Sequence, residues 1–141
     1  MIAYGLANYK SETFTAVASV SGTMLDCTKT PSHPMPMVHL LGTAGDTLPY
    51  VGNNYFKGAQ TVLNHWTAFT NTDTKATVTS DASSGMTIEK YVYDQGDSGV
   101  AVVHYKYIGG GHNLYLGWES NPHSLQNRIL NPARLPIPPP R

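Results

Sequence analysis

The feature that most constrains the fold is a pair of almost continuous apolar runs, each of which stops at a glycine-containing turn. The runs are FTAVASVSGT at 14–23 and MPMVHLLGTAGD at 35–46. A strand without strict apolar–polar alternation is covered on both faces, as in a parallel sheet flanked by helices. The segment 59–71 supplies such a helix, because its apolar residues recur at helical spacing. The sequence therefore predicts the α/β class with a mostly parallel sheet.

Four further segments complete the expected order of elements. MIAYGLANYK at 1–10 is expected to be helical, and SGVAVVHYKYI at 98–108 is expected to be the last strand. KATVTSD at 75–81 and GMTIEKYVYD at 85–94 alternate well enough to form an antiparallel pair. In open α/β sheets ligands bind at the carboxyl ends of the strands, so the loops after the main strands are the places to look for a site.

Composition excludes several classes of function. Charged residues make up 13% of the 141 residues, the formal net charge is zero, and no cluster of basic residues suits a phosphate backbone. We expect no nucleic-acid or membrane partner, because no run approaches the roughly 20 apolar residues of a membrane span. The start lacks the basic and apolar regions of a signal peptide. Cys27 is the only cysteine, so the chain forms no internal disulfide.

Two regions are expected, 1–120 as the folded part and 121–141 as a tail. The tail holds all three arginines, six of the ten prolines and no acidic residue. That composition predicts an irregular, disordered extension. Read-through or frameshifted sequence has the same composition, and the sequence does not separate these causes.

Two short patterns suggest chemistry but have simpler interpretations. GDSG at 96–99 matches the nucleophile loop of chymotrypsin-like proteases, yet the chain is too short for that fold, so a turn between two strands explains it better. His33 and His39 have no common zinc-ligand spacing and no nearby cysteine or carboxylate partner. His39 lies within an apolar strand and is expected to be a hydrogen-bonded core residue.

Asp46 and His112 form the stronger pair. Each comes just after an expected strand, and a helix and a hairpin separate them. In α/β-hydrolases the acid and the histidine follow the serine in this chain order, each on a loop after a strand. A carboxylate on one imidazole nitrogen fixes the tautomer, which leaves the other nitrogen to accept a proton from a nucleophile.

The segments around both residues resemble the esterase and polyhydroxybutyrate-depolymerase family, which includes feruloyl and acetylxylan esterases. MPMVHLLGTAGDTLPYVGN resembles the family's P-V-P-V-L-H-I-H-G-T-A-D-x-x-V-P-Y-x-G, and GGGHNLYLGW resembles G-G-G-H-x-W-P-G. MIAYGLANYKSETFTAVASVSGTM resembles M-x-A-Y-x-L-A followed by F-A-A-V-A-P-V-A-G-T. The likeness runs from Met1 to about Gly117.

The resemblance implies a partial α/β-hydrolase fold, the C-terminal half only, in which the nucleophile-bearing N-terminal half is missing. In the family the MIAY segment directly follows the G-x-S-x-G-G turn, so the serine lies outside this chain. An ungapped alignment places Gly45 at the acid position, and Asp46 serves only with a one-residue shift of the loop. After His112 the W-P-G segment is altered, and the Pro-rich tail replaces the final helix.

The resemblance further implies an enzyme that hydrolyses carboxylic esters by acyl transfer, with His112 and Asp46 as catalytic residues and a polyhydroxyalkanoate or plant cell-wall ester as substrate. It implies no metal or other cofactor, and a secreted or periplasmic protein. The isolated chain is expected to lack turnover. Residues expected to line the substrate cleft are Tyr50, Asn53, Tyr115 and Trp118.

Two alternatives remain open. One is a non-catalytic α/β module that binds carbohydrate or polymer through its Tyr- and Trp-bearing loops. The other is a fragment that docks on another chain carrying the serine half.

Overall fold

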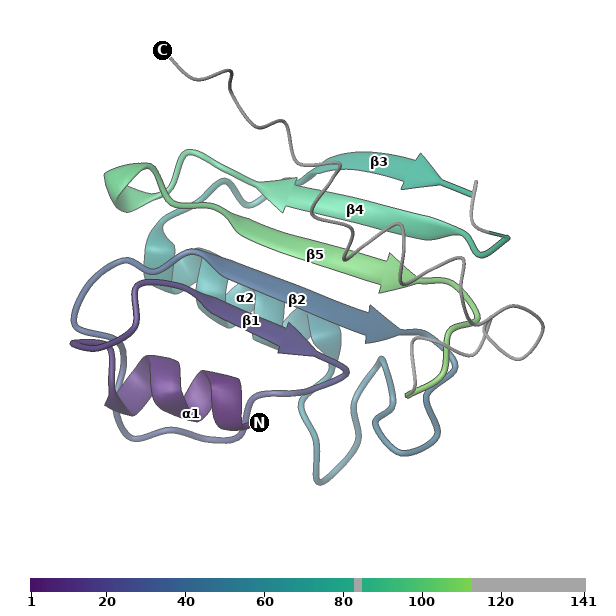
Figure 1. The fold of residues 1–141 in the computed structure, drawn as a ribbon, viewed down its shortest axis with the longest axis horizontal. Coiled ribbons are helices and arrows are strands. Elements are labelled where there is room, and N and C mark those ends of the chain that lie inside the picture. The colour runs from purple at the N-terminus through teal and green to yellow at the C-terminus, as the bar shows by residue number, and fades with distance from the viewer. Residues whose placement is uncertain (83–84, 113–141) are drawn as a thin grey trace, which may run out of the picture.

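A five-stranded sheet with two helices forms the body of the protein (Figure 1). The computed structural model describes residues 1–82 and 85–112. The expected tail at 121–141 and the last residues of the 1–120 region lie outside these ranges. The elements are α1 (Ile2–Tyr9), β1 (Val17–Val20), β2 (Met37–Gly42), α2 (Ala59–Thr70), β3 (Thr77–Asp81), β4 (Ile88–Tyr93) and β5 (Val102–Tyr107), with one 3-10 turn at Asp97–Gly99.

The sheet is mixed, in the order β1-β2-β5-β4-β3. β1 pairs with β2 and β2 pairs with β5 in parallel, whereas β4 pairs with β5 and β3 pairs with β4 antiparallel. The predicted α/β class is confirmed, and the predicted antiparallel pair is β3–β4. The expectation of a mostly parallel sheet holds only for β1, β2 and β5, because β4 and β3 join β5 as a hairpin.

Every expected helix and strand is present with shorter bounds. The GDSG motif forms the tight turn between β4 and β5, as the simpler interpretation predicted. Its Ser98 has φ 58° and is exposed on that turn.

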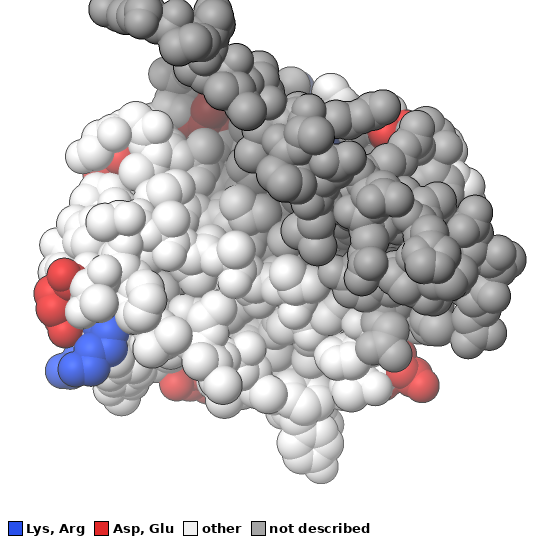
Figure 2. Space-filling view, viewed as in Figure 1, with Lys and Arg blue, Asp and Glu red and all other residues white. Residues whose placement is uncertain are grey.

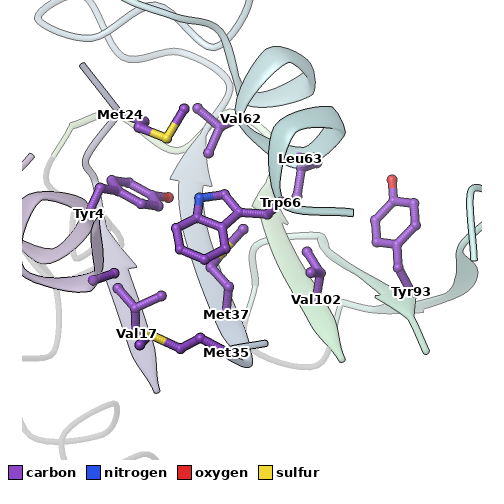
Figure 3. Packing of buried hydrophobic residues seen from close by; sticks show 11 residues of the cluster. Tyr4, Val17, Met24, Met35, Met37, Val62, Leu63, Trp66, Tyr93 and Val102 are labelled. Atoms are coloured by element: carbon purple, nitrogen blue, oxygen red, sulfur yellow. The ribbon is translucent and has the colours of Figure 1, made fainter. Parts of the chain in front are cut away.

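The main core lies between the sheet and the two helices, as Figure 3 shows. Trp66 of α2 is fully buried, and its ring centroid lies 6.1 Å from that of Tyr4 on α1. The helices therefore pack on one another as well as on the same face of the sheet. The buried members of this core are Tyr4, Ala7, Val17, Met24, Met35, Met37, Val62, Leu63, Trp66, Tyr93 and Val102.

The opposite face of the sheet is the one that points away from α1 and α2. No helix of the described residues covers it, and Val20 at the end of β1 is 56% exposed. Figure 2 shows that the described surface on this side carries only scattered charged side chains. Within residues 1–82 and 85–112, neither helix has the length and apolar character needed to cross a bilayer.

A candidate active site at the carboxyl edge of the parallel strands

The loops after β2 and β5 are bonded to each other where the two parallel strands end. The backbone N–H of Thr43 donates to the carbonyl of Tyr107 at 3.0 Å, and that of Ala44 donates to the carbonyl of Gly110 at 2.9 Å. The N–H of Gly109 donates to Oγ1 of Thr43 at 2.8 Å. These three bonds hold the segment that leads to Asp46 against the segment that leads to His112.

Glycines make this contact sterically possible. A Cβ on Gly42 would overlap the carbonyl group of Gly110, so the two backbones approach more closely than side chains permit. Gly109 has φ +76°, a left-handed conformation that glycine adopts without the usual steric cost. The glycine triplet after β5 therefore turns the chain sharply at the sheet edge and brings it against the neighbouring loop.

Asp46 lies on the loop between β2 and α2 and is exposed. Its Oδ1 accepts a hydrogen bond from the backbone N–H of Thr47 at 2.7 Å and a longer one, 3.3 Å, from the Thr47 hydroxyl. The carboxylate thus stabilises its own turn, and its remaining oxygen is available to another donor.

His112 is exposed on the loop after β5, and its backbone lies beside Gly45. A Cβ placed on Gly45 would be 3.6 Å from the backbone nitrogen of His112. In the described part of the chain, the side chains of Asp46 and His112 form neither an ion pair nor a hydrogen bond. The fold therefore brings together the two loops, and Gly45, the position that the ungapped alignment assigns to the acid, lies beside the backbone of His112.

A buried chain of hydrogen bonds lies directly beneath this edge. His39 of β2 pairs in register with His104 of β5, and their rings stack with centroids 5.0 Å apart. Nε2 of His104 lies 2.8 Å from the hydroxyl of Tyr50, and Nδ1 of His104 lies 3.1 Å from the carbonyl of His39. A carbonyl only accepts, so Nδ1 of His104 carries the proton and Nε2 accepts from Tyr50.

His39 is a core residue, as predicted, but only one of its nitrogens is paired. Its Nε2 donates to the carbonyl of Gly22 at 3.0 Å, whereas Nδ1 is buried without a partner among the described residues. Burial and, to a smaller extent, the neighbouring His104 together lower the pKa of His39 to about 4. Burial also lowers the pKa of His104 to about 4. Both imidazoles are therefore neutral at pH 7.

Burial raises the pKa of the Tyr50 phenol above its ordinary value, so the hydroxyl keeps its proton and remains a donor to His104. Tyr50 was expected to line the substrate cleft. Its hydroxyl is used inside the protein, although the residue is only partly buried. Asn53 is exposed on the loop before α2, whereas Tyr115 and Trp118 lie outside the described residues.

The structure also places the remaining candidates. His33 precedes β2 and so lies toward the opposite edge of the sheet. Cys27 is a free thiol. Among the residues described, no three His, Cys, Asp or Glu side chains lie close enough together to hold a metal ion.

No protein-family model and no curated protein matches this chain.

Sequence reasoning did not identify the pairing of His39 with His104 or the bond from Tyr50. His39 and His104 are 65 residues apart, and only the strand order places them side by side. The signal available in the sequence was a histidine in the middle of each of two apolar strands.

Proposed function

We propose that this chain carries the histidine and the carboxylate of a serine-type carboxylic-ester hydrolase. The observation that carries the proposal is the backbone contact between the loops after β2 and β5, above all the bond from Ala44 to Gly110. It joins two exposed loops of which one holds Asp46 and the other holds His112. The resemblance in sequence names the same two residues.

Each residue has a distinct role in the proposed reaction. His112 accepts the proton of a serine hydroxyl as the serine attacks the ester carbonyl, and then returns the proton to the leaving alcohol. Asp46 accepts a hydrogen bond from the other imidazole nitrogen, which fixes the tautomer and stabilises the imidazolium. In the proposal the two exposed side chains meet across loops that are already bonded to each other through their backbones.

The nucleophile in this proposal comes from a polypeptide segment other than residues 1–141. Among the described residues, no serine hydroxyl is hydrogen-bonded to His112. The edge of the sheet at β1 offers a place for such a segment, because β1 pairs only with β2 in the described part of the chain. The carboxyl end of β1 lies at the same edge as the two loops, so a parallel strand added there would end near them. The substrate class is a carboxylic ester, and we propose a secreted or periplasmic location on the resemblance alone.

The test is hydrolysis of p-nitrophenyl acetate by the chain with and without a co-expressed segment that ends in a strand and a G-x-S-x-G-G turn. We expect no turnover by the chain alone and saturable turnover by the pair. His112→Ala should lower kcat of the pair by about 10³–10⁴, because removal of a triad member leaves only the remaining stabilisation.

His33→Ala is the matched control, since His33 lies toward the opposite edge of the sheet, and it should leave kcat unchanged. Turnover by the pair that survives His112→Ala would overturn the proposal. Histidine-dependent turnover by the chain alone would show that the nucleophile lies within residues 1–141.

A further inference from the structure

A cavity of about 340 Å³ lies at the same edge of the sheet, between the loop after β1 and the loop before α2. In Figure 1 the connection from β2 to α2 extends well beyond the strands at this edge. The volume is in the lower part of the range of about 300–1,000 Å³ found for ligand pockets. The lining residues that matter here are Asp26, Val51, Asn53, Asn54, Tyr55 and Lys57.

The walls of the cavity are fixed by bonds between the two loops. The hydroxyl of Thr23, itself 1% exposed, donates to the carbonyl of Lys57. The ammonium of Lys57 forms an ion pair with Oδ1 of Asp26. The loop before α2 closes on itself through an isolated antiparallel bridge between Gly52 and Lys57. A ligand therefore meets a formed site, and little conformational entropy is lost on binding.

The tip of this loop is held by Asn53. Its Oδ1 accepts the backbone N–H groups of Tyr55 at 2.8 Å and Phe56 at 2.9 Å. The turn leaves the side chain of Tyr55 83% exposed and that of Val51 88% exposed. An aromatic ring this exposed offers its face to a ligand, because no neighbouring side chain covers it.

The polar groups around this ring specify a neutral ligand that has donors as well as acceptors. Lys57 and Asp26 neutralise each other, so the cavity attracts neither an anion nor a cation strongly. The bond to Lys57 uses one oxygen of Asp26, and the highly exposed carboxylate has further acceptor capacity. Asn54 is exposed in the lining and adds an amide with one acceptor and two donors. A ligand that displaces water from these acceptors keeps its affinity only if it replaces the lost hydrogen bonds, which hydroxyl groups can do.

We propose that this cavity binds a single ring of a neutral carbohydrate. The apolar C–H face of the ring stacks on Tyr55, and its hydroxyls donate to Asp26 and accept from the amide of Asn54. A polyester chain fits less well, because ester oxygens only accept hydrogen bonds and cannot replace water that the chain displaces from the carboxylate. The inference goes beyond the proposed hydrolase and does not require it, since binding needs no nucleophile.

The cavity is coupled to the candidate site through packing. Phe56, which lines the cavity, packs against the small core cluster formed by Leu41, Leu48 and Ala59. Leu48 lies two residues after Asp46 on the same loop. A sugar held in the cavity is therefore positioned by the same loop that carries the proposed catalytic carboxylate.

The experiment is an NMR titration of the isotope-labelled chain with cellotriose and, separately, with an end-capped 3-hydroxybutyrate trimer that has no hydroxyl group. We expect saturable shifts in the amides of 24–26 and 51–58 with cellotriose and none with the trimer. Tyr55→Ala should weaken cellotriose binding at least tenfold, and Tyr55→Phe should retain most of it, because the ring face remains.

Phe14→Ala is the matched control, since Phe14 is also an exposed aromatic residue and lies outside the cavity. It should leave cellotriose affinity unchanged. Equal binding of the capped trimer would assign the cavity to a polyester and overturn the inference, as would the absence of saturable shifts at these amides. Neither result would bear on the hydrolysis assay, which tests His112 directly.

Discussion

The hydroxyl oxygen of Tyr50 lies 2.8 Å from Nε2 of His104, and this bond ties the loop after β2 to the strand that leads to His112. The two residues are 54 positions apart in the sequence. The bond is partly buried, directly beneath the backbone contact between the loops of Asp46 and His112. It joins a side chain of the loop that carries Asp46 to a side chain of the strand that leads to His112.

Removing this hydroxyl should weaken the fold. Tyr50→Phe keeps the ring but leaves Nε2 of the buried His104 without a donor, which costs about 1–3 kcal/mol. Urea unfolding followed by circular dichroism measures the loss. Tyr55→Phe is the same chemical change on an exposed ring and should alter the free energy of unfolding by less than about 0.5 kcal/mol. Equal effects of the two variants would contradict the role assigned to the bond.

Mild acid should destabilise the protein. His39 and His104 have native pKa values of about 4, below the ordinary value of 6.5, because burial disfavours their charged forms. Below pH 6.5 the unfolded chain takes up protons that the native state does not, so stability falls as pH drops toward 4. The slope reaches about 1.4 kcal/mol per pH unit for each of the two histidines. Burial lowers the pKa of His65 as well, which adds to the effect in the same direction.

Urea unfolding at pH 7, 6 and 5 checks this pH dependence. His104→Gln should reduce the slope between pH 6 and 5, because it removes one of the buried histidines with a lowered pKa. Stability that is constant from pH 7 to 5 would show that the histidines are not held in their neutral form.

Widening the contact between the loops after β2 and β5 should lower the free energy of unfolding. Gly42→Ala places a methyl group against the carbonyl of Gly110, and overpacking of this kind costs about 1–3 kcal/mol. The amide of Ala44, bonded to Gly110, should then exchange its hydrogen faster. Gly5→Ala on α1 is the control, because a Cβ there meets no atom within 4 Å and alanine favours the helix. It should stabilise the protein slightly, and protection of Ala44 that is equal in both variants would contradict the contact.

An aspartate at position 45 should be able to replace Asp46 in part as the acid of the proposed triad. Asp46→Asn should lower kcat of the complemented enzyme by about 10³–10⁴, as loss of a triad acid does. A Cβ on Gly45 would lie 3.0 Å from the carbonyl of Leu48 and 3.6 Å from the nitrogen of His112. Adding Gly45→Asp to Asp46→Asn should therefore recover part of the activity after a small loop adjustment. Full activity of Asp46→Asn by itself would remove Asp46 from the mechanism.

The edge strand β1 should drive self-association of the isolated chain. β1 presents no charged side chain, Val20 is 56% exposed, and nearby Ile2 on α1 is 80% exposed. Unprotected apolar edges pair with other chains, and a lysine blocks this pairing. Sedimentation velocity should show less association for Val20→Lys than for the parent chain. Val78→Lys, on the opposite edge strand β3, should have a smaller effect, and equal effects would exclude β1 as the associating edge.

The order of helices and strands was predictable because it depends on local patterns. The periodicity around Trp66 predicted α2 and its buried face, and glycines after the apolar runs predicted where β2 and β5 end. The antiparallel pair was also predictable, since β3 and β4 are neighbours in sequence and alternate. Residue type and spacing along the chain carry this information directly.

The strand order and the buried network were decided by the tertiary structure. Local sequence patterns do not predict that β5 inserts between β2 and β4, because strand pairing depends on which apolar faces can be buried together. That choice turned a sheet expected to be mostly parallel into a mixed one and stacked His39 on His104. It also directed the hydroxyl of Tyr50 inward and left Tyr55 on the surface. Two tyrosines five residues apart on one loop differ in role because of the strands beneath them.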